Sequence, residues 1–277
     1  MVRLLQIEFI KLWNNRASRI LIASYFILLT SIALVAAIKF DIGPVKFHMA
    51  EQGIFNFPYI WHFNTYVTGF FKLFLAIVIV SMMANEYSNK TIKQNLIDGL
   101  SKKEFILSKF LTVVVFSLIS TVFVFVVSLI LGLIYSDYNE LSIIFSDLEF
   151  VLAFCFKLIG FFSFCLFLGI LVKRSAFALG FLFLWYIFEW IVFWFFGANI
   201  TNWEGAQRIK NFLPLEAISN LIKEPATRLS AVQNIGEQIG EKMNFDYQVY
   251  WYEFLIVILW TLIFVYLSHA LLKKRDL

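Results

Sequence analysis

Six apolar stretches, each about as long as a membrane-crossing helix, dominate this sequence; they cover approximately residues 18–38, 65–84, 111–135, 148–172, 176–196 and 250–272. A helix needs roughly 20 apolar residues to cross the hydrocarbon core, where its backbone polar groups must be satisfied within the helix. Charged residues make up 15% of the chain, whereas a soluble domain has roughly a quarter. The sequence therefore predicts an all-α, polytopic membrane protein with six spans in a single domain, residues 1–277.

Lysine and arginine are unevenly distributed between the two sides that six spans create. With the N-terminus in the cytoplasm, the inner segments hold fourteen of these residues and the outer loops seven, five of them in the long loop before the last span. Cytoplasmic segments carry the excess of positive charge, and long loops count little. We therefore expect both termini to be cytoplasmic. The same rule explains the basic segments without a nucleic-acid partner.

The segments outside the spans also contain helical patterns. Residues 1–16 have an apolar stripe, which predicts an amphipathic helix in the membrane interface, with a plain extension of the first span as the alternative. The first outer loop contains Gly43, Pro44, Gly53 and Pro58, so we expect it to be irregular. The outer segment 197–249 is predicted to hold two helices, one after Pro214 and one over 229–243. Their apolar residues are Leu215, Ile218, Leu221 and Ile222, and then Leu229, Val232, Ile235, Ile239 and Met243.

The polar stretch 85–110, between the second and third spans, has the pattern of two helices that meet at a corner. Ile92, Leu96 and Ile97 have helical spacing, so a short helix here has one apolar side. Gly99 follows it and tolerates the left-handed conformation that often ends a helix.

A second helix is predicted to start directly after this turn. Ser101 is followed three residues later by Glu104, which is the pattern of a capping box. A helix continuous from 102 to about 135 is about 50 Å long, which exceeds the roughly 30 Å hydrocarbon core. Its first turns are therefore expected to project out of the membrane.

Three charged residues fall inside the apolar stretches: Lys72, Lys157 and Glu189. A charge that faces lipid costs several kcal/mol or more, so these side chains are expected to face protein or water. We predict that Glu189 lies within about 8 Å of Lys157 or Lys72, as in a close ion pair. Two interpretations remain open: these residues form a polar lining of a transport path, or they are structural, as a buried pair or a snorkelling lysine.

The chemistry of most enzymes is missing from the sequence. It contains no Gly-x-x-x-x-Gly-Lys-Ser/Thr loop, so we do not expect this chain to bind ATP in that way. Its three histidines and two cysteines lack metal-ligand spacing, and no metal or cofactor is expected.

The stretch 85–110 resembles the cytoplasmic loop of ABC-2 type permeases, the membrane subunits of a large class of bacterial ABC transporters. The family often has Gly before the Thr, where this chain has Lys90, and Pro-Ser-Arg or similar at the turn, where it has Gly99-Leu100-Ser101-Lys102. The plan of the whole chain, with its N-terminal helix, six spans and long outer segment, is similar to that of the family. The residues that match the local pattern are Glu86, Thr91, Gly99, Ser101, Lys103 and Lys109.

The resemblance implies a permease subunit, not an enzyme, in a bacterial cell (inner) membrane. Two permease copies, identical or different, would pair among the membrane lipids with separate ABC ATPase subunits that bind ATP and Mg. The region 86–104 would couple to the ATPase, and the cargo would be an exported amphipathic, lipid-like or peptide substrate. The implied coupling residues are Glu86, Thr91, Ile92, Leu96, Gly99, Ser101, Lys103 and Lys109.

Two other classes of function remain open. The chain could be a structural or ATP-independent membrane subunit of a larger machine, or a membrane-embedded lipid-modifying enzyme. A pull-down in mild detergent separates the three, because only the permease retains a stoichiometric ATPase.

Overall fold

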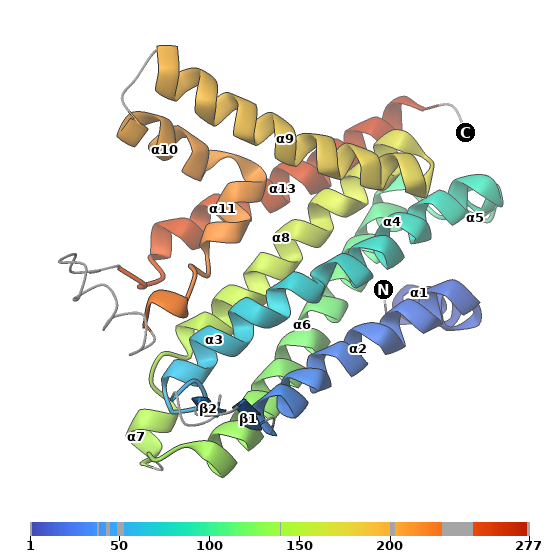
Figure 1. The fold of residues 1–277 in the computed structure, drawn as a ribbon. Helices are drawn as coiled ribbons and strands as arrows, with labels where there is room; N and C mark the ends of the chain where they lie inside the picture. The colour runs from blue at the N-terminus through green and yellow to red at the C-terminus, as the bar shows by residue number, and fades with distance from the viewer. Residues whose placement is uncertain are drawn as a thin grey trace.

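The structure, a computed structural model, describes residues 2–37, 39–42, 45–48, 53–138, 140–199, 203–228 and 246–275. Most of these residues are helical, as predicted, and the long helices form an elongated bundle (Figure 1). The long helices and the first helix are α1 (Val2–Asn14), α2 (Arg16–Ala37), α3 (Tyr59–Thr68), α4 (Lys72–Ser88), α6 (Lys102–Tyr135), α8 (Glu149–Val172), α9 (Ser175–Asn199) and α13 (Trp251–Lys274).

Five segments of the described chain are long and apolar enough to cross a membrane: Tyr59–Ser88, Lys102–Tyr135, Leu141–Val172, Ser175–Ala198 and Trp251–Lys274. The first expected span corresponds to α2, which has 22 residues. With α2 counted as the first span, a total of six spans stays a prediction. The segment Tyr59–Ser88 begins earlier than expected and is interrupted by a 3₁₀ turn, η2 (Gly69–Phe71), between α3 and α4.

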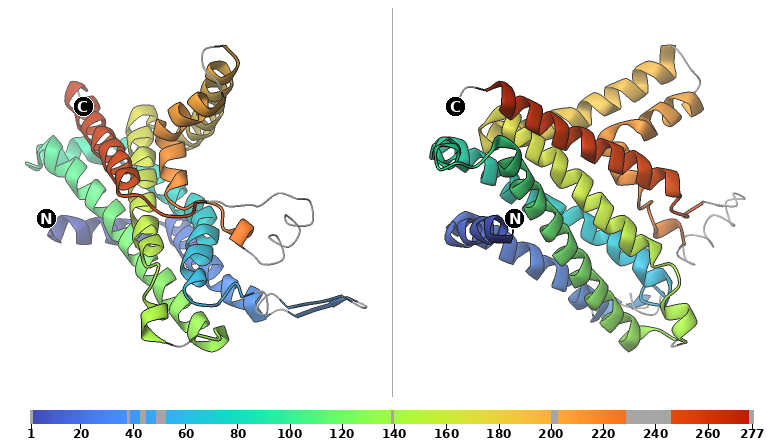
Figure 2. Two further views of the ribbon diagram at one scale, coloured as in Figure 1. Left: turned by 90° about the vertical axis from the view of Figure 1, so that its left-hand side faces the viewer. Right: turned by 180° about the vertical axis from the view of Figure 1, so that it is seen from behind.

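Helix α8 lies at the centre of the bundle. It packs against α4, α6, α9 and α13, and 72% of the residues in its apolar stretch are buried, against 17% in α9. Gly160 allows α13 to approach α8 closely, because a Cβ at this position would lie 2.9 Å from Val257 of α13. The core is therefore arranged around α8, whereas α9 lies at the edge, as Figure 2 shows.

The loop between α2 and α3 differs from the prediction. Strands β1 (Lys39–Ile42) and β2 (Val45–His48) pair as an antiparallel hairpin, with Lys39 opposite His48 and Ile42 opposite Val45. Strand-forming residues alternate on both sides of positions 43–44, which favours a local hairpin over an irregular loop.

The outer segment before α13 contains the predicted helix after Pro214, α11 (Pro214–Asn220), and Leu215 and Ile218 are buried in it. It also contains α10 (Trp203–Phe212), which was not predicted, and a 3₁₀ turn, η3 (Ala226–Arg228). Helix α10 lies along α9, and the ring centroids of Trp203 in α10 and Trp194 in α9 are 5.2 Å apart. The second predicted outer helix, over 229–243, lies outside the described residues.

Candidate functional site

Helix α5 (Thr91–Ile97) forms the corner between α4 and α6. Figures 1 and 2 show α5, α1 and the last turn of α13 at the same end of the bundle, opposite α7 (Leu141–Ile144). We call the following group the corner site: helix α5, Glu8 and Lys11 of α1, Glu86 of α4, and Lys109 of α6.

The chain enters α5 through a left-handed residue. Lys90, the N-cap of α5, has φ +54° and ψ +20°. An L side chain in this region costs roughly 1–2 kcal/mol per residue, and glycine escapes most of that cost. The resemblance leads us to expect glycine at position 90. The left-handed backbone conformation at this position also favours glycine.

The chain leaves α5 through a Schellman motif at Gly99, which has φ +96°. The Leu100 N–H donates to the Asn95 carbonyl (3.0 Å), and the Gly99 N–H donates to the Leu96 carbonyl (3.2 Å). This pair of bonds satisfies the last carbonyls of the helix. The predicted helix end at Gly99 is confirmed.

Substitutions at these two positions should have opposite effects. Lys90→Gly is expected to raise the free energy of unfolding by about 0.5–1 kcal/mol, because the relieved steric cost exceeds the roughly 0.4–1 kcal/mol of added chain entropy. Gly99→Ala is expected to lower it by about 1–2 kcal/mol. A Cβ at Gly99 meets no atom within 4 Å, so that loss is conformational. Unfolding in mixed detergent and SDS micelles measures both, and a stabilising Gly99→Ala would contradict this account.

Helix α6 begins with the predicted capping box. The Glu104 N–H donates to Ser101 Oγ (3.2 Å), and the Ser101 N–H donates to Glu104 Oε2 (3.0 Å). From Lys102, α6 continues without interruption for 34 residues, about 51 Å. The corner is therefore joined directly to a helix that runs the length of the bundle.

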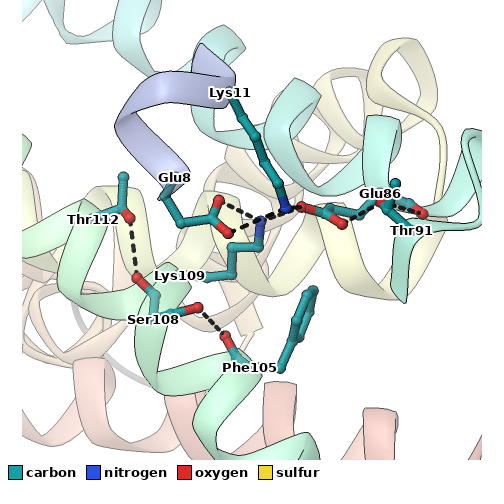
Figure 3. Close-up of polar contacts among 8 residues, drawn as sticks. All are labelled: Glu8, Lys11, Glu86, Thr91, Phe105, Ser108, Lys109 and Thr112. Carbon is teal, nitrogen blue, oxygen red and sulfur yellow. Dashed lines mark hydrogen bonds and ion pairs between the residues drawn. The ribbon is translucent and has the colours of Figure 1, made fainter. Parts of the chain in front are cut away.

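A network of four charges lies beside α5, in which Glu8, Glu86 and Lys109 are buried and Lys11 is 39% exposed (Figure 3). Lys109 of α6 is fully buried, and its Nζ donates to Glu8 Oε2 (2.5 Å) and to Glu86 Oε1 (2.6 Å). Lys11 adds a bond to Glu86 Oε1 at 2.9 Å and an ion pair with Glu8 at 3.6 Å. Two carboxylates and two ammonium groups balance, so the burial of each charge is compensated.

Glu86 also binds α5 directly. Its Oε2 accepts a hydrogen bond from the Thr91 hydroxyl, and its carbonyl accepts a second one at 3.3 Å. Burial lowers the pKa of Lys11, but Glu8 and Glu86 outweigh it and raise the pKa above its ordinary value. Lys11 is therefore positively charged at neutral pH, and Glu86 joins α1, α4, α5 and α6.

The end of α13 adds a second set of contacts. Arg275 donates to the Tyr87 hydroxyl (3.0 Å), to the Leu171 carbonyl (2.9 Å) and to the Ile170 carbonyl. Lys102 Nζ in turn donates to the Arg275 carbonyl at 2.9 Å. The ends of α4, α6, α8 and α13 are thus held together beside the charge network.

Helix α5 has an inner and an outer side. Ile92 is buried and Leu96 packs against the core, which confirms the apolar side predicted for them. Ile97 points away and is 75% exposed, so the prediction that it shares this side is wrong. Lys103, on the first turn of α6, is also exposed.

Sequence reasoning did not single out Glu8 and Lys11 as site residues. Glu8 lies on the apolar stripe of α1, between Leu5 and Leu12, and is only 5% exposed. An acid on the buried side of an amphipathic helix requires a partner, and that was the available signal. A cleft of 320 Å³, lined by Glu8, Lys11, Glu86 and Thr91 among others, separates α1 from the α4–α5 junction.

The three charges within the apolar stretches are not part of the corner site, and among the described residues Glu189 forms no ion pair with Lys72 or Lys157. A separation within about 8 Å stays a prediction. Within the described chain, Glu189 makes no ion pair; it accepts bonds from the N–H groups of Leu215 and Glu216 and from Trp185 Nε1, each at 2.9 Å. The backbone N–H groups at the start of α11 thus occupy the carboxylate that was expected to bind a lysine.

Removal of this carboxylate should loosen α11. Glu189→Ala leaves two backbone N–H groups and one indole N–H without their acceptor, and each such group costs about 1–3 kcal/mol. We expect the free energy of unfolding to fall by about 3 kcal/mol and by less in Glu189→Gln, which keeps one acceptor oxygen. Detergent–SDS unfolding measures the series. An equal loss in both variants would indicate that the charge, and not the acceptor atoms, holds α11.

A known protein family matches most of this chain. A family described as ABC-2 family transporter protein matches residues 14–277. The matched range contains Glu86, Thr91 and Lys109, whereas Glu8 and Lys11 precede it. No curated protein matches the chain.

Proposed function

The chain belongs to the ABC-2 family of transporter proteins, membrane permeases of ABC transporters, and on this premise we propose that it is an exporter subunit driven by a separate ATPase chain. The sequence contains no phosphate-binding loop of the Gly-x-x-x-x-Gly-Lys-Ser/Thr form, so the proposed motor is another chain, which would bind ATP and Mg²⁺. In this proposal α5 is the contact with that ATPase.

The observation that carries the proposal is the position of Lys109. Its amine lies between Glu8 of α1 and Glu86 of α4, and Glu86 in turn holds Thr91 of α5. A push on α5 therefore moves α1, α4 and the start of α6 together, because each is tied to the next by buried charged bonds. Such tightly packed contacts have few intermediate arrangements, so movement is transmitted rather than absorbed.

The two helices that leave the corner differ in how they can carry this movement. Helix α6 is continuous over its 34 residues and acts as a lever. Helix α4 ends at η2, and a 3₁₀ turn inside a longer helix often marks a hinge. We propose that α6 transmits the displacement along the bundle and that the α3–α4 segment bends at η2.

The proposed topology has six spans, with α2 as the first, and places both termini and α5 in the cytoplasm of a bacterial cell. A second copy, identical or related, completes the pathway. The exposed aromatic side of α9 supports this arrangement and an amphipathic, lipid-like or peptide cargo. That side includes Phe183, Ile187, Trp190, Ile191 and Trp194.

Co-purification tests the proposal. The tagged chain, expressed in its native host and extracted in mild detergent, should retain an ABC ATPase at a fixed stoichiometry. Reconstitution of the pair in lipid should change the rate of ATP hydrolysis relative to the ATPase alone. A chain that purifies without an ATPase and acts by itself on a lipid would refute the permease assignment in favour of an enzyme.

A further inference from the structure

Two lysines in the apolar part of the bundle have no acidic partner among the described residues. Lys72 begins α4 and is 8% exposed, and Lys157 lies within α8 and is 5% exposed. Lys72 contacts the Phe161 ring (4.4 Å from the centroid) and makes no hydrogen bond within the part of the chain that the structure describes. Lys157 donates a hydrogen bond to the Ser219 carbonyl (3.1 Å).

The same molecule shows how a lysine is buried for structural purposes. Lys109 is also buried, but two carboxylates surround it and use its donors. Lys72 and Lys157 leave most of their six N–H donors unused, and a buried charge without a counterion is expensive. No carboxylate of the described residues compensates the charge that these two lysines carry when protonated, so an anion bound beside them would be favoured.

Both lysines line the same cavity. Its volume is 480 Å³, and it lies between α3–α4, α8, α9 and α11. Tyr66 and Ser219, which carry hydroxyl groups, also line it. The apolar side chains of Phe70 and Leu73 also line it, and they are 63% and 50% exposed, so one side of the cavity opens onto an apolar surface.

The two charges at the far side of the cavity are already engaged. Lys223 donates to the carbonyls of Asp246 and Gln248 and lies 3.9 Å from Glu253. Glu224 accepts a bond from the Ala226 N–H at 2.7 Å. Lys72 and Lys157 are therefore the basic groups in this wall with most of their N–H donors unused within the described residues.

The backbone of η2 lies beside the amine of Lys157. A Cβ at Gly69, the first residue of the turn, would be in van der Waals contact with both Cε and Nζ of Lys157, at 3.8 Å. Lys72 follows the turn directly. The turn thus brings Lys72 to the same part of the wall as Lys157.

We infer that this cavity binds a phosphate group with about two negative charges, such as a phosphomonoester or diphosphate. A phosphomonoester carries about −1.5 to −2 charges at pH 7, which matches two ammonium groups, and its three oxygens can accept from both amines. The open apolar side suits a hydrocarbon chain attached to that phosphate. Binding stands independently of transport; only the role of the bound molecule as cargo rests on the proposed function.

Lipid binding by the purified chain, without any ATPase, tests the inference. In phosphatidylcholine nanodiscs, addition of phosphatidic acid should raise the melting temperature more than phosphatidylglycerol does, because a phosphomonoester carries more charge than a diester. Lys72→Met/Lys157→Met should weaken phosphatidic acid binding at least about tenfold, the loss expected for one buried charged hydrogen bond. Lys173→Met, at an exposed lysine beyond the end of α8, should leave binding unchanged.

Two further measurements distinguish a lipid phosphate from free phosphate and control for misfolding of the variants. If inorganic phosphate at millimolar concentration competes with phosphatidic acid, the site accepts a free anion; if it does not, the site requires the lipid. The double variant should melt no lower than the wild type in phosphatidylcholine alone, because methionine removes an uncompensated charge and keeps most of the side-chain volume. Unchanged phosphatidic acid binding in the double variant, or in both single variants if the double variant misfolds, would overturn the inference.

Discussion

Lys109→Met is expected to lower the free energy of unfolding by about 3–5 kcal/mol, because it leaves two buried carboxylates without their shared partner. Glu8 and Glu86 are 5% and 4% exposed, so water cannot replace the lost ammonium group. The same substitution should uncouple ATP hydrolysis from transport, since α1 and α4 lose their connection to α6. SDS unfolding and the ATPase rate of the reconstituted pair measure the two effects.

Two comparisons isolate the network from the mere loss of a lysine. Lys103→Met makes the same chemical change on the same helix at an exposed position and should alter stability by less than about 0.5 kcal/mol. Glu8→Gln/Lys109→Met removes one charge of each sign and retains the Lys11–Glu86 pair at 2.9 Å. This variant should recover more than half of the stability lost in Lys109→Met. If the double variant is the less stable of the two, charge balance does not explain the role of Lys109.

Ile97→Asp is expected to weaken binding of the ATPase by roughly 10–100-fold without a change in the stability of the permease. Ile97 is 75% exposed on α5, so the isolated chain gains nothing from its side chain. Burial of an isoleucine in an interface contributes about 1.5–3 kcal/mol, and an aspartate at the same place adds a desolvation cost. Titration of the ATPase against nanodisc-embedded permease gives the dissociation constant.

The matched control for this substitution is Leu141→Asp. Leu141 is 72% exposed, and it lies on α7 at the opposite end of the bundle. This variant should bind the ATPase as the wild type does. Equal affinities for Ile97→Asp and wild type would place the docking surface elsewhere and would leave the role of the charge network in transport untouched.

Local features were predictable wherever the interacting residues are close in sequence. The end of α5 at Gly99 and the start of α6 at Ser101 depend on residues within five positions of each other, and both are confirmed. Segment length and hydrophobicity predicted the five apolar segments of membrane-crossing length that are found among the described residues. The hairpin of β1 and β2 is equally local, but the prediction for this loop weighed its Gly and Pro residues and not the alternating residues beside them.

Partners distant in sequence were not predictable. A buried charge shows that a partner is required but not which one. Glu189 obtained backbone N–H groups of α11 in place of a lysine, and every segment of a chain offers such groups. Lys90 illustrates a second limit of the sequence. The sequence shows that Lys90 departs from the family pattern, but only the positive φ angle in the structure explains why glycine suits that position.

The sequence by itself determined a helical membrane protein with a structured corner between two of its long helices, because hydrophobic length, helix caps and turn residues act over a few neighbouring positions. The tertiary structure decided which charges meet there. Glu8 and Lys109 are 101 positions apart, and their contact exists because α1 packs against α6. Which helices become neighbours depends on the packing of the whole bundle, and no single stretch of sequence encodes it.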